Sequence, residues 1–180
     1  FACFITYKSK RFCSQSRNYP PLFASTFVAI YLKLSQRDLH IALVGNPNSG
    51  KSSIFNALTG LHQQVGNFPG VTVDKKTGRL QLPDATNTTL IDLPGTYSLY
   101  PRRADEWVAY KVLMGTDESV TTDAVLLVAD ASNLKRNLLF CSQIIDLQIP
   151  VVMALTMNDI ASSKGIKIDD IVFFIAGKIG

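Results

Sequence analysis

The chain has 180 residues, 47% of them apolar, and a mean hydropathy of +0.16, which suits one globular domain with a buried core. Its net charge of +4 comes from residues 1–37, which hold six basic residues and no acidic one, and this excludes a nucleic-acid binder whose basic charge lies on a folded face. Three cysteines and two histidines exclude a disulfide framework and a His/Cys metal cluster.

Residues 1–37 form a basic leader that receives no assignment and is expected to be disordered. Its longest apolar stretch, residues 22–34, is too short to span a bilayer and is interrupted by polar residues. A signal or transit segment is the alternative interpretation. Because the chain begins with Phe1 and ends at Gly180 after an apolar run, we expect a fragment of a longer protein.

The first half of the body predicts a strand, a helix and two further strands. Residues 39–44 are an apolar run typical of a buried strand, and residues 52–58 have helical spacing with Gly60 as the stop. Residues 61–76 show no sustained period and predict a loop. Residues 77–82 and 88–91 predict two strands around a turn.

The second half continues the alternation of strands and helices. Residues 104–114 predict a helix, and residues 124–129 and 150–155 predict strands buried on both faces. Residues 134–147 predict a helix with one apolar face, made of Leu134, Leu138, Cys141, Ile144 and Ile145. The order of elements over residues 38–180 predicts a three-layer α/β fold with a mostly parallel central sheet.

A phosphate-binding motif follows the first predicted strand. The segment Gly45-Asn46-Pro47-Asn48-Ser49-Gly50-Lys51-Ser52 matches G-x-x-x-x-G-K-[ST] at every fixed position. Such a loop wraps a phosphate with backbone N–H groups, and the helix that follows directs its positive N-terminus at the same anion. We expect Lys51 to reach the β- and γ-phosphates and the Ser52 hydroxyl to ligate Mg²⁺.

Two further segments are expected to respond to the terminal phosphate. Asp92-Leu93-Pro94-Gly95 ends the strand at 88–91, where a carboxylate can hold Mg²⁺ through water and the Gly95 N–H can contact the γ-phosphate. Thr72 lies in the loop after the first helix. A threonine there can complete the Mg²⁺ shell when the γ-phosphate is present and leave it after hydrolysis.

The base-reading position is expected at the end of the strand at 150–155, in Thr156-Met157-Asn158-Asp159. The Asp159 carboxylate can accept two hydrogen bonds, from N1–H and from the exocyclic amine of guanine. Adenine lacks this pair of donors, so the residue predicts a preference for GTP over ATP.

Together, GNPNSGKS, VGNFPGVTVDKKTG, DLPGTYSL, ADASNLKRNLL and PVVMALTMNDIASSKGIKID resemble the FeoB-type GTPases, the N-terminal G domains of bacterial ferrous iron transport protein B. The resemblance covers roughly residues 39–170 and implies a P-loop GTPase fold. It implies Lys51, Thr72 and Gly95 as the catalytic set, and Ser52, Thr72 and Asp92 as Mg²⁺ ligands. Asn48 matches an asparagine linked in some relatives to potassium-stimulated hydrolysis.

The nucleotide-binding set that we expect comprises Gly45, Asn46, Pro47, Asn48, Ser49, Gly50, Lys51, Ser52, Ser53, Gly70, Val71, Thr72, Asp92, Leu93, Pro94, Gly95, Thr156, Met157, Asn158 and Asp159.

The sequence departs from the family pattern at one position and from the pattern of many small GTPases at another. The fourth G motif usually reads Asn-x-x-Asp, but Thr156 stands in place of the Asn; its hydroxyl can tether the P-loop and contact the base. Thr96 follows Gly95 where many small GTPases have a water-orienting glutamine, so slow hydrolysis is expected. The chain ends before the family's fifth G motif, its helical regulatory domain and its membrane permease domain.

By this resemblance the parent would lie in the bacterial inner membrane, with this domain on the cytoplasmic face. GTP or GDP would be the ligand, the permease domain and a small cytosolic accessory protein would be the partners, and no nucleic acid would bind. A stand-alone GTPase of ribosome or tRNA-modification type is the main alternative, and a non-catalytic nucleotide sensor is the other.

Overall fold

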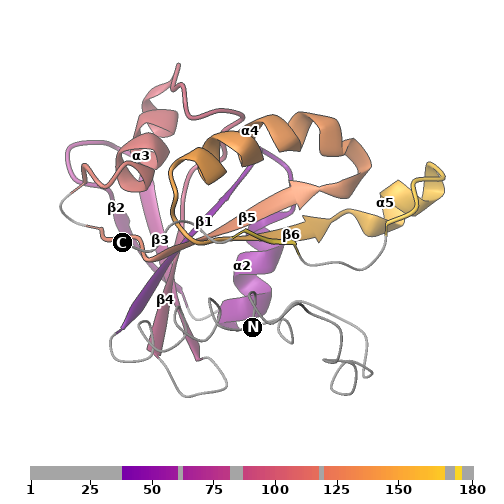
Figure 1. Ribbon diagram of the computed structural model, residues 1–180. Coiled ribbons are helices and arrows are strands. Elements are labelled where there is room, and N and C mark those ends of the chain that lie inside the picture. Colours follow the sequence, from indigo (N-terminus) through magenta and orange to yellow (C-terminus); the bar gives the residue numbers. More distant parts are fainter. Residues whose placement is uncertain (1–37, 61–62, 82–86, 118–119, 169–172, 176–180) are drawn as a thin grey trace, which may run out of the picture.

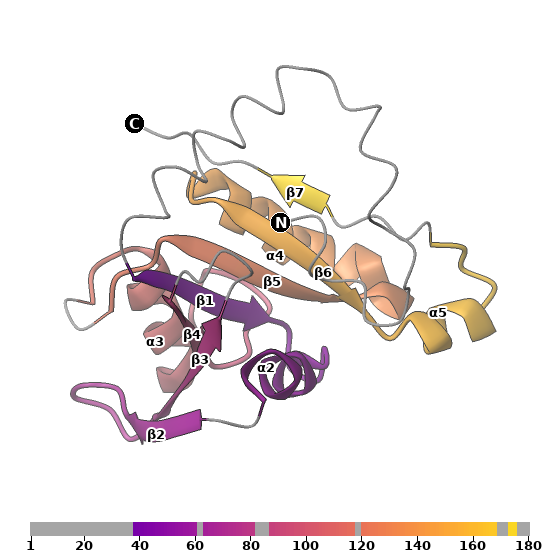
Figure 2. The same cartoon turned by 90° about the horizontal axis from the view of Figure 1, so that it is seen from below.

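The structure, a computed structural model, describes residues 38–60, 63–81, 87–117, 120–168 and 173–175. A seven-stranded sheet in the order β2-β3-β4-β1-β5-β6-β7 crosses this part of the chain (Figures 1 and 2). The strands are β1 (Leu39–Gly45), β2 (Gln63–Asn67), β3 (Asp74–Gln81), β4 (Asn87–Asp92), β5 (Ala124–Asp130), β6 (Val151–Thr156) and β7 (Phe173–Ile175).

The centre of the sheet is parallel and its edges are antiparallel. β1 pairs in parallel with β4 and β5, and β5 pairs in parallel with β6. The β2–β3, β3–β4 and β6–β7 pairs are antiparallel. The carboxyl ends of β4, β1, β5 and β6 therefore meet at one edge, where parallel α/β sheets bind their ligands.

Helices cover both faces of the sheet, as the alternating elements predict. The helical segments are α2 (Lys51–Thr59), α3 (Ala104–Leu113), the 3-10 turn η1 (Ala131–Asn133), α4 (Leu134–Asp146) and α5 (Asn158–Ser163). α2 lies on one face, and α3 and α4 lie on the other (Figures 1 and 2). The predicted three-layer α/β fold is confirmed.

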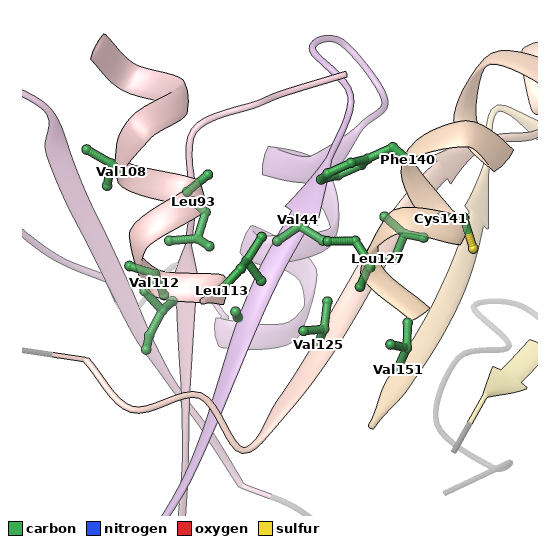
Figure 3. Close-up of a cluster of buried hydrophobic side chains, with 14 of the residues drawn as sticks. Val44, Leu93, Val108, Val112, Leu113, Val125, Leu127, Phe140, Cys141 and Val151 are labelled. Carbon is green, nitrogen blue, oxygen red and sulfur yellow. The ribbon is translucent and has the colours of Figure 1, made fainter. Parts of the chain in front are cut away.

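The period of two along the strands explains the three layers. In β1, Leu39, Ile41 and Leu43 pack on the α2 side with Phe55. Val44 points to the opposite face and packs with side chains of α3 and α4, among them Phe140 (Figure 3). Both faces of the central strands are thus apolar, which accounts for the continuous apolar runs in the sequence.

Residues 61–76, predicted to be a loop, contain strand instead, which corrects that prediction. Residues 63–67 form β2, and β3 begins at Asp74. All five residues of β2 are exposed, so no apolar alternation marks the strand in the sequence. Its backbone pairing with β3 forms this edge of the sheet, and the pairing depends on tertiary contact rather than on local pattern.

The buried face of α4 also differs from the predicted one. Leu138 is 47% exposed, whereas Asn137 is buried and donates from Nδ2 to the Asn133 carbonyl at 2.9 Å. The buried residues Asn137, Phe140, Cys141 and Ile144 follow a stripe that passes beside Leu138. Burial raises the pKa of the Cys141 thiol, a free cysteine that packs as an apolar group.

Three segments discussed in the sequence analysis lie partly or wholly outside the described residues. These segments are the leader at 1–37, most of the turn between β3 and β4, and the end of the chain after residue 175. Within the described part, α5 and β7 are elements that the sequence patterns did not predict. Among the described residues, no helix has the length and apolar character needed to cross a membrane.

Candidate functional site

The loop between β1 and α2 turns sharply at two residues in the left-handed region. Asn48 has φ 63° and Gly50 has φ 81°. Glycine adopts this conformation without strain, and asparagine is one of the few other residues that tolerate it. The Ser49 N–H donates to the Asn46 carbonyl at 3.2 Å, so the loop closes on itself before α2 begins at Lys51.

Two other glycines lie in closely packed positions, and neither has a positive φ angle. A Cβ at Gly45 would lie 2.6 Å from the Val128 carbonyl oxygen and 2.8 Å from Ser49 Oγ. A Cβ at Gly95 would lie 3.1–3.4 Å from atoms of Pro47. The loop is therefore in close contact with β5 on one side and with the segment after β4 on the other.

Lys51 and Asp92 form an ion pair at the carboxyl ends of β1 and β4. Their side chains are only 13% and 10% exposed. An ion pair with so little exposure is screened weakly by solvent, so each charge holds the other in place. Ser52, the next residue on α2, is exposed. A carboxylate and a hydroxyl from adjacent elements are oxygen ligands of the kind that Mg²⁺ prefers.

The segment after β4 runs along the loop through backbone hydrogen bonds. The Leu93 N–H donates to the Leu43 carbonyl at 3.1 Å, and the Thr96 N–H donates to the Gly45 carbonyl at 3.2 Å. The Thr96 hydroxyl is turned into its own loop, where it donates to the Ser98 carbonyl at 2.8 Å. Pro94 and Gly95 thus lie beside the phosphate loop, while Leu93 is buried in the core.

Thr72 lies in a closed turn that leads into β3. The Phe68 N–H donates to the Val73 carbonyl at 3.0 Å, and the buried Phe68 ring anchors this turn to the core. Gly70, with φ 75°, and Thr72 are exposed, and Val71 packs partly against the core. Since β3 runs antiparallel to β4, the turn lies at the sheet edge at which Asp92 ends its strand.

The end of β6 is tied directly to the phosphate loop. The Thr156 hydroxyl lies 2.6 Å from the Ser49 carbonyl oxygen and 3.2 Å from the Ala129 carbonyl oxygen. Met157 then takes a left-handed conformation, with φ 56°, before α5 starts. Asn158 and Asp159 are exposed in the first turn of α5.

Two buried polar atoms of the loop have no hydrogen-bond partner among the described residues: Asn46 Oδ1 and Ser49 Oγ. Buried polar groups in native proteins are nearly always paired, so exceptions need an explanation such as a functional role. A phosphate loop whose backbone and side chains are arranged for a ligand provides one.

The structure brings together the loop at 45–52, the segment at 92–96 and Thr156, which lie far apart in the sequence. It leaves Ser52, Ser53, Thr72, Asn158 and Asp159 exposed around the same edge. Sequence reasoning missed the Ala129 carbonyl as a partner of Thr156. The register of β5 against β6, in which Ala129 lies opposite Leu155, brings the two groups together, and no local sequence pattern indicates that register.

Comparison with known proteins relates this chain to a family. The family model described as "Ferrous iron transport protein B" matches residues 39–173. The Fe(2+) transporter FeoB of Leptospira biflexa is 47% identical over 133 residues, which is 74% of this chain and 19% of that protein. The Fe(2+) transporter FeoB of Salmonella typhimurium is 45% identical over 137 residues, which is 74% of this chain and 17% of that protein. The chain therefore spans less than a fifth of the length of these relatives.

Solved structures show the same similarity. The G domain of the T. maritima FeoB iron transporter matches with a TM-score of 0.65 and 42% identity, covering 74% of this chain and 78% of that one. A variant of S. thermophilus NFeoB bound to mGDP matches with a TM-score of 0.65 and 45% identity, covering 72% and 48%. The cytosolic domain of T. maritima FeoB in its GMPPNP form matches with a TM-score of 0.64 and 42% identity, covering 71% and 48%.

Proposed function

The chain belongs to the ferrous iron transport protein B family, and we propose that its residues 38–180 are a switch domain that binds GTP with Mg²⁺ and hydrolyses it slowly. One observation carries this proposal. The phosphate loop, the Asp92 segment and Thr156 are joined at the carboxyl edge of the sheet by an ion pair and hydrogen bonds. The family match over residues 39–173 favours this proposal over the alternative, a stand-alone GTPase of ribosome or tRNA-modification type.

The phosphate loop would bind the anion with charges and dipoles that are already in place. Backbone N–H groups of residues 45–50, except Pro47, which has none, and the N-terminus of α2 attract negative charge. The Lys51 ammonium group would exchange the Asp92 carboxylate for phosphate oxygens, which are acceptors of the same charge. Lys51 and the Gly95 N–H would then stabilise the charge that develops on the γ-phosphate.

Mg²⁺, when bound, neutralises charge on the β- and γ-phosphates. Ser52, Thr72 and Asp92 would hold it, because a serine hydroxyl, a threonine hydroxyl and a carboxylate meet its preference for oxygen. Thr72 is exposed on its turn, so its side chain could join or leave the site while Phe68 stays in the core. This property suits a switch that reports the presence of the γ-phosphate.

The proposed ligand is tested by calorimetry on the chain with GDP and, separately, ADP in the presence of Mg²⁺. GDP is expected to bind and ADP to bind at least about tenfold more weakly, since a paired set of hydrogen bonds to the base is worth about 1–3 kcal/mol. Absence of heat with GDP, on protein whose circular dichroism shows the α/β fold, would contradict the proposal.

Asn48 is proposed to contribute its side-chain oxygen to a K⁺ ion, and GTP hydrolysis is then expected to run severalfold faster in KCl than in NaCl. Asn48 has φ 63°, so Asn48→Ala combines loss of the amide with backbone strain. Asn48→Gly removes the amide without that strain and is the sharper variant. Both variants should hydrolyse GTP equally fast in the two salts. Equal rates for the unmodified chain would remove potassium from the proposal.

For the full-length parent, we propose a ferrous iron transporter whose permease domain responds to the nucleotide state of this domain. The relatives are named Fe(2+) transporter FeoB, and more than four fifths of their length lies outside the part that this chain matches, which is long enough for a membrane domain. The domain would then lie on the cytoplasmic face of the bacterial inner membrane, with a small cytosolic accessory protein as a further partner.

A further inference from the structure

Thr156 occupies the place at which the family's fourth motif has asparagine. Its hydroxyl group already donates to backbone carbonyl oxygens of the protein. A hydroxyl has one proton and can donate one hydrogen bond at a time. Two carbonyl oxygens compete for that proton, Ser49 at 2.6 Å and Ala129 at 3.2 Å. The shorter contact, to Ser49, is the stronger, and it joins the end of β6 to the phosphate loop.

The bond to Ser49 also fixes the direction of the next N–H group. The described residues contain no cis peptide bond, and in a trans peptide the C=O and N–H groups point in opposite directions. Holding the Ser49 oxygen toward Thr156 therefore turns the Gly50 N–H away from β6. A Cβ built on Gly50 would lie 3.6 Å from Thr156 Cβ and Cγ2, so the two residues are also in packing range.

We propose that Thr156 is a positioning residue, which sets nucleotide affinity through the phosphate loop and makes no hydrogen bond to the base. This inference rests on the proposed guanine-nucleotide site. An asparagine amide has two N–H groups and can serve a carbonyl and a base together, whereas the single proton of threonine serves the loop. Base recognition is then left to the Asp159 carboxylate.

The test compares Thr156→Val, which removes the hydroxyl at nearly constant shape, with Thr156→Ser, which keeps it. Calorimetry or competition would measure the dissociation constants of GDP, 7-deaza-GDP, 6-thio-GDP and GMP on the whole chain with Mg²⁺. 7-deaza-GDP lacks the N7 acceptor and 6-thio-GDP weakens the O6 acceptor, so the two analogues report any hydrogen bond from Thr156 to the base.

Thr156→Val is expected to weaken GDP, 7-deaza-GDP and 6-thio-GDP by the same factor, about tenfold. GMP lacks the phosphate that the loop wraps, so its loss should stay below about twofold. Thr156→Ser should restore all four constants to within about threefold of the unmodified chain. A general loss of structure would lower GMP and GDP binding alike, so the ratio between them separates positioning from misfolding.

The inference is overturned if the loss for GDP exceeds that for either analogue by about fivefold, because Thr156 would then contact the base. Equal GDP binding by Thr156→Val and the unmodified chain overturns it as well. If the unmodified chain fails to bind GDP at all, the proposed function falls and this inference falls with it. The first measurement thus tells the two failures apart.

Discussion

Lys51→Ala is expected to raise the dissociation constant of GDP by about a hundredfold or more. The ammonium group would make charge-assisted hydrogen bonds to phosphate oxygens, each worth about 1.5–3 kcal/mol, and alanine makes none. Alanine would also leave the Asp92 carboxylate, which is 10% exposed, without its partner beside an incoming phosphate of like charge. Calorimetry with GDP and Mg²⁺ measures the change.

The matched control is Lys111→Ala, which removes the same charge from an exposed position in the last turn of α3. This variant should bind GDP within about twofold of the unmodified chain, because exposed charges contribute little at a distance in physiological salt. Full GDP affinity in a folded Lys51→Ala protein would mean that the loop at 45–52 does not bind the phosphates.

Asp159→Asn is expected to weaken GDP more than tenfold and to strengthen xanthosine diphosphate. A carboxylate accepts from both N1–H and the exocyclic amine of guanine, whereas an amide presents one acceptor and one donor. Its NH₂ group would face the guanine amine unpaired but would find the 2-oxo group of xanthine. Unpaired polar groups cost about 1–3 kcal/mol, which sets the size of the change.

Competition between GDP and xanthosine diphosphate for the same site measures this change in preference. Asp146→Asn, the same substitution at the exposed last residue of α4, is the control and should leave the order of the two ligands unchanged. If Asp159→Asn keeps the guanine preference of the unmodified chain, another residue reads the base.

The sequence predicted the central fold because its signals are local. The apolar runs at 39–44, 124–129 and 150–155 correspond to β1, β5 and β6. β1 and β5 are one residue longer at the carboxyl end, and β6 is shifted by one residue toward it. Gly60 is the predicted stop of the first helix, and in the structure it is the residue after α2, in the left-handed conformation that glycine adopts at helix ends. The phosphate-binding motif is also a local signal, because the spacing of its glycines within eight consecutive residues predicts the backbone turn.

Other features depend on contacts that no local pattern contains. Gly78 lies within β3, and a side chain there would collide with Thr59 and approach Phe55 of α2. The sequence around Gly78 does not indicate that α2 packs against this position. β2, exposed along its whole length, exists because β3 lies beside it.

By itself, then, the sequence determined which segments would be strands and helices at the centre of the fold, and it predicted which residue types are expected to face a nucleotide. The tertiary structure alone decided which groups are paired. Thr156 donates to a carbonyl 107 residues earlier in the chain, and Lys51 pairs with a carboxylate 41 residues later. Residue spacing fixes backbone conformation over a few residues, whereas a hydrogen-bond partner is set by how strands align and pack in space.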